Sequence, residues 1–119
     1  MKPLTPLSDL LELEAAIQES VERPVLLFKH SRQCGVSCEA LDELRSHIDR
    51  HAGPVAYKMI TVQTHRPLSD AAASRLGIRH ETPQAILLKD GKPVWSASHF
   101  RITAAQLDEL FARAAVERN

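Results

Sequence analysis

The stretch that decides the fold is residues 25–38, VLLFKHSRQCGVSC. Its beginning, Val25–Phe28, is an unbroken apolar run, which is typical of a strand covered on both faces. Small and polar residues follow, and apolar residues then return at helical spacing between positions 41 and 48. We therefore predict a buried strand followed by a helix that begins at Cys34.

The flanking sequence continues this alternation of strand and helix. Ser8 and Asp9 offer a cap for a helix whose apolar stripe runs from Leu10 to Ile17. Asp90-Gly91 is a strong signal for a hairpin between two strands. The remaining predicted elements are a strand at Val55–Val62, a helix at Pro67–Leu76 with Gly77 just past its end, strands at Ala85–Leu88 and Pro93–Ala97, and a last helix capped by Thr103.

The order of these elements predicts an α/β fold. The early alternation implies a parallel β-α-β unit with a right-handed crossover, and the hairpin adds an antiparallel pair. We predict a single domain over residues 1–119, built as a four-stranded mixed sheet with helices on both faces and an N-terminal helix.

Composition excludes several classes of function. The 119 residues contain 15 basic and 15 acidic side chains, so the net charge is zero and the footprint of a nucleic-acid or membrane-surface binder is absent. Apolar residues make up 44%, which is enough for a core. No apolar run approaches the roughly 18 residues of a membrane span, and Met1–Leu10 does not resemble a secretory signal. We expect a cytoplasmic monomer without nucleic-acid or membrane partners.

Cys34 is the candidate nucleophile. At the first turn of a helix, unpaired backbone N–H groups and the helix dipole stabilise a thiolate. Such a site lowers the pKa of a cysteine from about 8.5 to roughly 3.5–7.5, and the thiolate is the attacking form in thiol–disulfide exchange. The alternative interpretation is a small apolar residue at the end of a strand.

Ser37 and Cys38 are the other candidate catalytic residues. Ser37 stands where a dithiol C-x-x-C motif has its second cysteine, and its hydroxyl could donate to the thiolate of Cys34 or simply be a first-turn serine. Helical neighbours four apart have Cβ atoms about 5–6 Å apart, whereas a disulfide needs about 3.5–4.5 Å. Cys38 therefore suits a transient resolving thiol, or a small half-buried residue, rather than a structural bridge. With His30, the two cysteines match no zinc spacing, so we predict no metal.

Several stretches resemble the YtxJ family of monothiol bacilliredoxins, which have the thioredoxin fold. They are Phe28–Ser31 with Cys34-x-x-Ser37, Arg66–Ser69, His80–Leu87, Lys89–Gly91 and Trp95–His99. The resemblance covers roughly Pro24–Leu110 and implies a thioredoxin-like thiol–disulfide oxidoreductase. Cys34 would take a low-molecular-weight thiol of the bacillithiol type from S-thiolated client proteins, with the small thiol as co-substrate and no bound cofactor.

The resemblance also implies substrate-binding residues. Thr82 and Pro83, together with His30, would bind the substrate, and the Thr82–Pro83 bond would be cis, although an X-Pro bond is trans by base rate. Gly35 departs from the family pattern, which has proline there. A looser first turn would let Cys34 approach Cys38, so that Cys38 releases the small thiol.

Two other functions fit the same motif. Cys34–Ser37 reads Cys-Gly-Val-Ser, one residue from the Cys-Gly-Phe-Ser of glutaredoxin-like iron–sulfur cluster carriers, but Ser96–His99 occupies the region where those proteins have their glutathione-binding stretch. A non-catalytic thioredoxin-like interaction module is the second alternative. In that module the pKa of Cys34 would stay near its free value.

Overall fold

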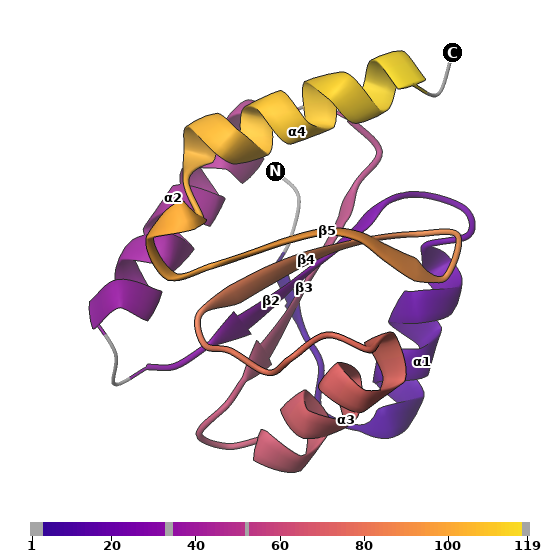
Figure 1. The fold of residues 1–119 in the computed structure, drawn as a ribbon, viewed down its shortest axis with the longest axis vertical. Helices are drawn as coiled ribbons and strands as arrows, with labels where there is room; N and C mark the ends of the chain where they lie inside the picture. The colour runs from indigo at the N-terminus through magenta and orange to yellow at the C-terminus, as the bar shows by residue number, and fades with distance from the viewer. Residues whose placement is uncertain (1–3, 33–34, 52, 118–119) are drawn as a thin grey trace.

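The computed structural model describes residues 4–32, 35–51 and 53–117, with side chains as far as Arg113. Five strands form one sheet in the order β1-β3-β2-β4-β5 (Figure 1). The elements along the chain are β1 (Leu4–Pro6), α1 (Leu10–Glu19), β2 (Val25–His30), α2 (Gly35–Arg50), β3 (Ala56–Thr61), α3 (Arg66–Leu76), β4 (Gln84–Lys89), β5 (Lys92–Ser98), the 3-10 helix η1 (His99–Arg101) and α4 (Ala104–Glu117).

The sheet is mixed, as predicted, but it has five strands instead of four. Strands β1, β3 and β2 are parallel, whereas β4 runs antiparallel to both β2 and β5. The additional strand is β1, which pairs Leu4 with Tyr57 and Pro6 with Met59. Three residues that end in a proline show no alternation of polar and apolar positions, so the sequence pattern did not reveal this strand.

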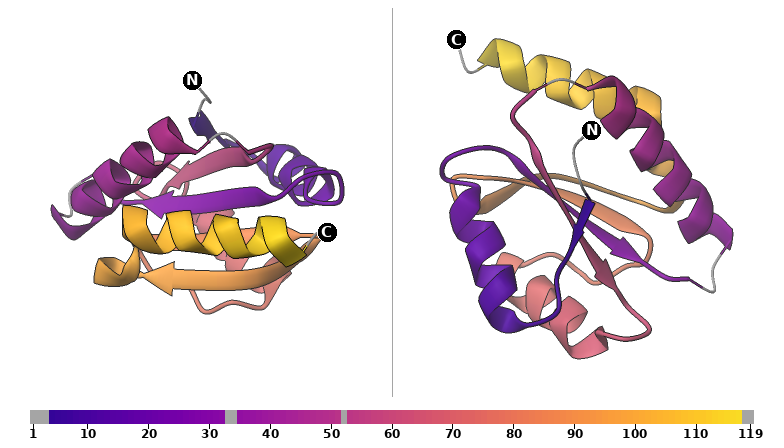
Figure 2. Two further views of the ribbon diagram at one scale, coloured as in Figure 1. Left: turned by 90° about the horizontal axis from the view of Figure 1, so that it is seen from above. Right: turned by 180° about the vertical axis from the view of Figure 1, so that it is seen from behind.

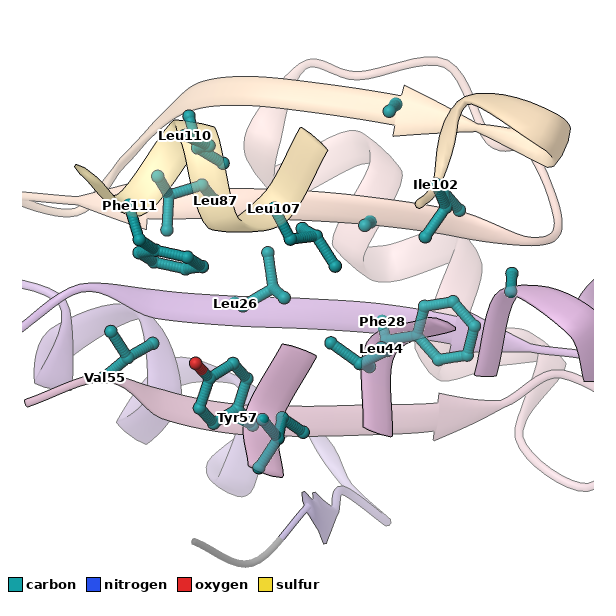
Figure 3. Packing of buried hydrophobic residues seen from close by; sticks show 14 residues of the cluster. Leu26, Phe28, Leu44, Val55, Tyr57, Leu87, Ile102, Leu107, Leu110 and Phe111 are labelled. Atoms are coloured by element: carbon teal, nitrogen blue, oxygen red, sulfur yellow. The ribbon is translucent and has the colours of Figure 1, made fainter. Parts of the chain in front are cut away.

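Both faces of the sheet are covered by helices. Figure 2 shows α2 and α4 over one face, while α1 and α3 cover the other. Strand β2 is buried along its whole length, and its side chains alternate: Leu26 and Phe28 pack with the α2 and α4 side, Val25 and Leu27 with the α1 and α3 side. Figure 3 shows the cluster on the first of these faces. The continuous apolar run thus divides between two cores.

Local signals in the sequence mark the boundaries of helices and strands as expected. The Asp9 carboxylate accepts the Glu12 N–H at 2.8 Å, and the Thr103 hydroxyl accepts the Gln106 N–H at 3.1 Å. In the β4–β5 turn, Asp90 and Gly91 have φ angles of 54° and 76°. Two positive φ angles match the two-residue turn that the Asp-Gly pair predicts.

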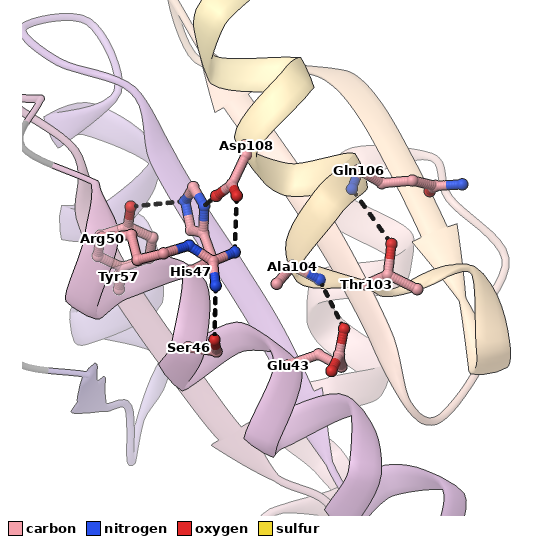
Figure 4. Close-up of polar contacts among 9 residues, drawn as sticks. All are labelled: Glu43, Ser46, His47, Arg50, Tyr57, Thr103, Ala104, Gln106 and Asp108. Atoms are coloured by element: carbon pink, nitrogen blue, oxygen red, sulfur yellow. Dashed lines mark hydrogen bonds and ion pairs between the residues drawn. The ribbon is translucent and has the colours of Figure 1, made fainter.

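A polar chain joins α2, β3 and α4 beside the core (Figure 4). The buried ring of His47 donates from Nδ1 to the Asp108 carboxylate at 2.6 Å, and its Nε2 lies 3.1 Å from the Tyr57 hydroxyl. Arg50 also donates to Asp108, at 2.7 Å. The protonation state of the His47 ring decides whether its Nε2 accepts from the Tyr57 hydroxyl or donates to it. These hydrogen bonds fix α4 against α2, whose first turn contains the candidate residues Ser37 and Cys38.

Within the described part of the chain, the helices are too short or too polar to cross a bilayer.

Candidate active site

The candidate site lies where β2 ends and α2 begins. Strand β2 ends at His30 and helix α2 begins at Gly35, one position after Cys34 in the sequence. Cys34 itself lies outside the described residues, so its role as nucleophile stays a prediction. The neighbouring residues are described, and they define the polar environment at this end of the sheet.

Ser37 is fully buried at the centre of a hydrogen-bond network. Its Oγ accepts the backbone N–H of Ser31 at 2.9 Å and lies 2.9 Å from Nδ1 of His30. If His30 carries its hydrogen on Nδ1, the hydroxyl hydrogen of Ser37 is available to another acceptor. If the hydrogen is on Nε2, the hydroxyl donates to His30 instead. The predicted donation from Ser37 to Cys34 therefore depends on the tautomer of His30.

His30 is buried, and its ring stacks on Phe28 with centroids 5.9 Å apart. Burial lowers the pKa of His30 below its usual value, and the positive charges of Arg32 and Arg45 lower it further. The imidazole is therefore neutral at pH 7. The same two arginines add positive potential at this end of β2, which favours a thiolate nearby.

Cys38 is an exposed free thiol in the first turn of α2. Its Sγ makes a weak contact of 4.0 Å with the carbonyl oxygen of Arg32, in the segment between β2 and α2. The side chain is not the half-buried residue of the alternative interpretation. An exposed thiol is accessible to a disulfide partner, and the resolving role of Cys38 stays a prediction.

Thr82 and Pro83 lie in the segment that leads into β4. The peptide bond between them is cis, as the resemblance implies and contrary to the base rate. The Thr82 hydroxyl lies 3.3 Å from Nε2 of His80, and the Pro83 carbonyl accepts the N–H of His99 at 3.1 Å. The segment is thereby tied to its own preceding residues and to η1. The substrate-binding role of Thr82, Pro83 and His30 stays a prediction.

A second polar network crosses the opposite face of the sheet. Lys29 is fully buried, and its Nζ donates to the carbonyl oxygen of Ser69 in α3 at 3.0 Å. The same Nζ lies 3.3 Å from Nδ1 of His80, which in turn contacts Thr82. Burial lowers the pKa of Lys29 to about 8. Sequence reasoning did not find this network, although one charged residue inside an apolar strand was a signal for it.

An open cavity of about 650 Å³ begins beside the Thr82–Pro83 segment. It is lined by Ile78, Arg79, Glu81, Gln84 and residues 96–101. Gln84 is 2% exposed and donates to the Arg79 carbonyl at 3.0 Å, whereas its Oε1 has no hydrogen-bond partner among the described residues. The exposed side chains of Arg79 and Arg101 place positive charge on this cavity, and the Glu81 carboxylate, 3.6 Å from Nδ1 of His99, adds negative charge.

Comparison with known proteins decides the family. A family model described as monothiol bacilliredoxin BrxC matches residues 5–107. The chain belongs to this bacilliredoxin family.

Solved structures agree on the fold. A protein described as a candidate oxidoreductase with a thioredoxin fold is 30% identical, with a TM-score of 0.78 over 88% of this chain and 90% of that one. Chloroplastic thioredoxin z is 21% identical, with a TM-score of 0.76 over 98% and 96%. Thioredoxin from Malassezia sympodialis is 15% identical, with a TM-score of 0.74 over 95% and 91%. This bacilliredoxin-family chain therefore has the thioredoxin-like fold, and its family and fold indicate a thiol redox function.

Proposed function

We propose that this protein removes a low-molecular-weight thiol of the bacillithiol type from mixed disulfides with client proteins. The observation that carries the proposal is the bacilliredoxin family match across residues 5–107, in a thioredoxin-like fold. The positive charges of Arg32 and Arg45, which act on His30 at the end of β2, and the open cavity with Arg79 and Arg101 support a thiolate and a small polar co-substrate. We place the reaction in the cytoplasm, where thiols stay reduced.

The first step of the proposed reaction is an exchange at sulfur. The Cys34 thiolate attacks the sulfur of the small thiol in the mixed disulfide. A new disulfide forms between Cys34 and the small thiol, the original disulfide breaks, and its electron pair leaves on the client cysteine as a thiolate. No net oxidation or reduction occurs, because one disulfide replaces another.

Cys38 performs the second step in this proposal. Its thiolate attacks Cys34 in the adduct, forms a Cys34–Cys38 disulfide and releases the small thiol as a thiolate. That disulfide is then reduced by two electrons from a dithiol reductase or from two further small-thiol molecules. The exposure of Cys38 makes it accessible for this step, and α2 begins only at Gly35.

The Cys34→Ser variant tests the first step. We expect this variant to lose removal of bacillithiol from an S-bacillithiolated test protein, because it lacks the attacking sulfur. Intact-mass spectrometry of the test protein over time measures the loss of the adduct. The Cys38→Ser variant is the matched control and should still remove the thiol. Unchanged removal by Cys34→Ser would contradict the proposal.

The Cys38→Ser variant tests the second step. We expect the Cys34 adduct to persist longer in this variant, because intramolecular release is lost. The measurement is the lifetime of the mass added to the protein after one turnover. An adduct lifetime equal to that of the wild type would exclude Cys38 as the resolving thiol.

The two alternative functions have their own observations. An iron–sulfur carrier would turn brown and dimeric on anaerobic reconstitution with iron and sulfide. A non-catalytic module would show a pKa of the Cys34 thiol near about 8.5 and ordinary peptide-thiol reactivity. Either result, without removal of the small thiol, would replace the proposed function.

A further inference from the structure

The charge of Lys29 is unusual for its surroundings. The side chain is fully buried in β2, and no ion pair joins it to a carboxylate within the described part of the chain. Its two hydrogen-bond partners, the Ser69 carbonyl and His80 Nδ1, are uncharged groups. A buried, unpaired cation normally destabilises a fold, and an apolar side chain of similar size is often better. This cost calls for a role beyond packing.

Lys29 determines which nitrogen of His80 carries the hydrogen. An ammonium group has three donors and no acceptor, so Nδ1 of His80, at 3.3 Å, has to accept. The Ser69 hydroxyl also lies 3.3 Å from Nδ1, but it can donate or accept and so does not select a tautomer by itself. Burial lowers the pKa of His80, and the charges of Lys29 and Arg66 lower it further, so the ring is neutral at pH 7. A neutral ring that accepts at Nδ1 carries its hydrogen on Nε2.

The consequence reaches Thr82. Nε2 of His80 lies 3.3 Å from the Thr82 hydroxyl and donates to its oxygen. The hydroxyl hydrogen of Thr82 is then directed to a different acceptor. Thr82 is partly exposed, so an acceptor from outside the protein has access to it. Lys29 and His80 are 51 residues apart in the sequence, and their contact links β2 to the segment before β4.

We propose that Lys29 acts through His80 as a positioning residue that holds the Thr82 hydroxyl as a hydrogen-bond donor toward the departing sulfur of a bound mixed disulfide. This inference rests on the proposed function and on the predicted substrate-binding role of Thr82. As the new Cys34 disulfide forms, the electron pair leaves on the client sulfur, and the Thr82 O–H stabilises that charge. Lys29, His80 and Thr82 keep their protons, and the client thiolate is later protonated by water.

The surrounding charges bear on the pH range of this arrangement. Burial lowers the pKa of Lys29, Asp70 raises it, and Arg66 lowers it. The charges of Lys29, Arg66, Asp70 and Glu81 act on His80, and the last two of these raise its pKa. Above a pH of about 8, Lys29 loses its proton and no longer forces Nδ1 to accept. The advantage of the wild type over a variant without the ammonium should therefore shrink above this pH.

The test compares Lys29→Met with Lys58→Met, both in a Cys38→Ser background. Lys58 lies on β3 and pairs with Glu19 of α1 at 3.2 Å. It is the matched control because it does not contact His80. Two rates are measured for each variant. The first is the rate of exchange with an S-bacillithiolated peptide, and the second is the rate of alkylation of Cys34 by iodoacetamide, which needs no contact with Thr82. At pH 7, Lys29→Met should slow exchange about fivefold to twentyfold, the effect of one hydrogen bond, and leave alkylation within about twofold. Lys58→Met should change neither rate.

Three further measurements separate this role from a structural one. Lys29→Met should unfold at an equal or higher urea concentration. Thr82→Val should slow exchange similarly, and the double variant should lose no more than either single variant. A ¹H–¹⁵N spectrum of the histidine rings should show hydrogen on Nε2 of His80 in the wild type and a mixture of tautomers in Lys29→Met.

The contradicting outcomes are equally distinct. Each of four results would overturn the inference. The first two are a wild-type His80 with its hydrogen on Nδ1 and an exchange rate unaffected by Lys29→Met. The other two are additive losses in the double variant and parallel losses of exchange, alkylation and stability. A wild-type protein that exchanges with no thiolated peptide would overturn the proposed function instead, and the ring spectrum would still report the tautomer.

Discussion

At the scale of single residues, Ser37 has the most constrained polar group of the candidate site. Its buried hydroxyl satisfies the Ser31 amide and contacts His30, each at 2.9 Å. Ser37→Ala should lower the free energy of unfolding by about 1–3 kcal/mol, because both groups lose a partner. Urea denaturation followed by circular dichroism measures the change. Ser46→Ala on the same helix, whose hydroxyl accepts an exposed bond from Arg50, is the control and should stay within about 0.5 kcal/mol. Equal stabilities of the two variants would refute this assignment.

At the scale of elements, the Asp108–His47–Tyr57 chain joins α4, α2 and β3. Tyr57→Phe keeps the buried ring and removes the hydroxyl that lies 3.1 Å from Nε2 of His47. We expect the free energy of unfolding to fall by about 1 kcal/mol, the usual contribution of one such hydrogen bond. Denaturation at pH 7 tests this, with Tyr57→Leu as a larger change that also removes packing. No loss in Tyr57→Phe would show that the bond to His47 does not stabilise the fold.

The elements also show how far the sequence reaches. Helices and strands that carry a long apolar pattern, such as Val25–Phe28, were predictable, as were the turn at Asp90-Gly91 and the caps. The three-residue β1 was not, because it is too short for a pattern. The sequence analysis did not predict the contact between His30 and Ser37, although the two residues are only seven positions apart in the chain. The contact of Lys29 with His80 depends on the pairing of Lys29 with Gln84 across β2 and β4, and this register is not encoded locally.

At the scale of the whole molecule, stability should depend on pH at both ends of the range. The folded pKa values of His30 and His80 are lowered, so below about pH 6.5 the unfolded chain binds protons that the folded protein does not. The free energy of unfolding therefore falls as the pH drops below that value. For Lys29 the folded pKa is about 8, against 10.5 for the unfolded chain. The cost of its buried charge is complete below pH 8 and is relieved as the pH rises from 8 to 10.5.

The difference between the wild type and Lys29→Met isolates the alkaline effect, since other groups are common to both proteins. We expect Lys29→Met to be the more stable protein at pH 7, by at most about 3 kcal/mol, with the difference shrinking toward pH 10. Urea titrations at pH 7, 8, 9 and 10 measure it. A difference that stays constant across this range would mean that Lys29 keeps its proton when buried.

The two outermost strands, β1 and β5, each contain a proline, Pro6 and Pro93. Proline offers no amide hydrogen to an incoming strand, and β5 also has an irregular register where it faces Leu87 and Leu88. Another chain that tried to extend the sheet would find an interrupted row of donors on either border. Concentrated solutions of this protein should therefore resist growth into fibres, even though its central strands are among the most apolar segments it has.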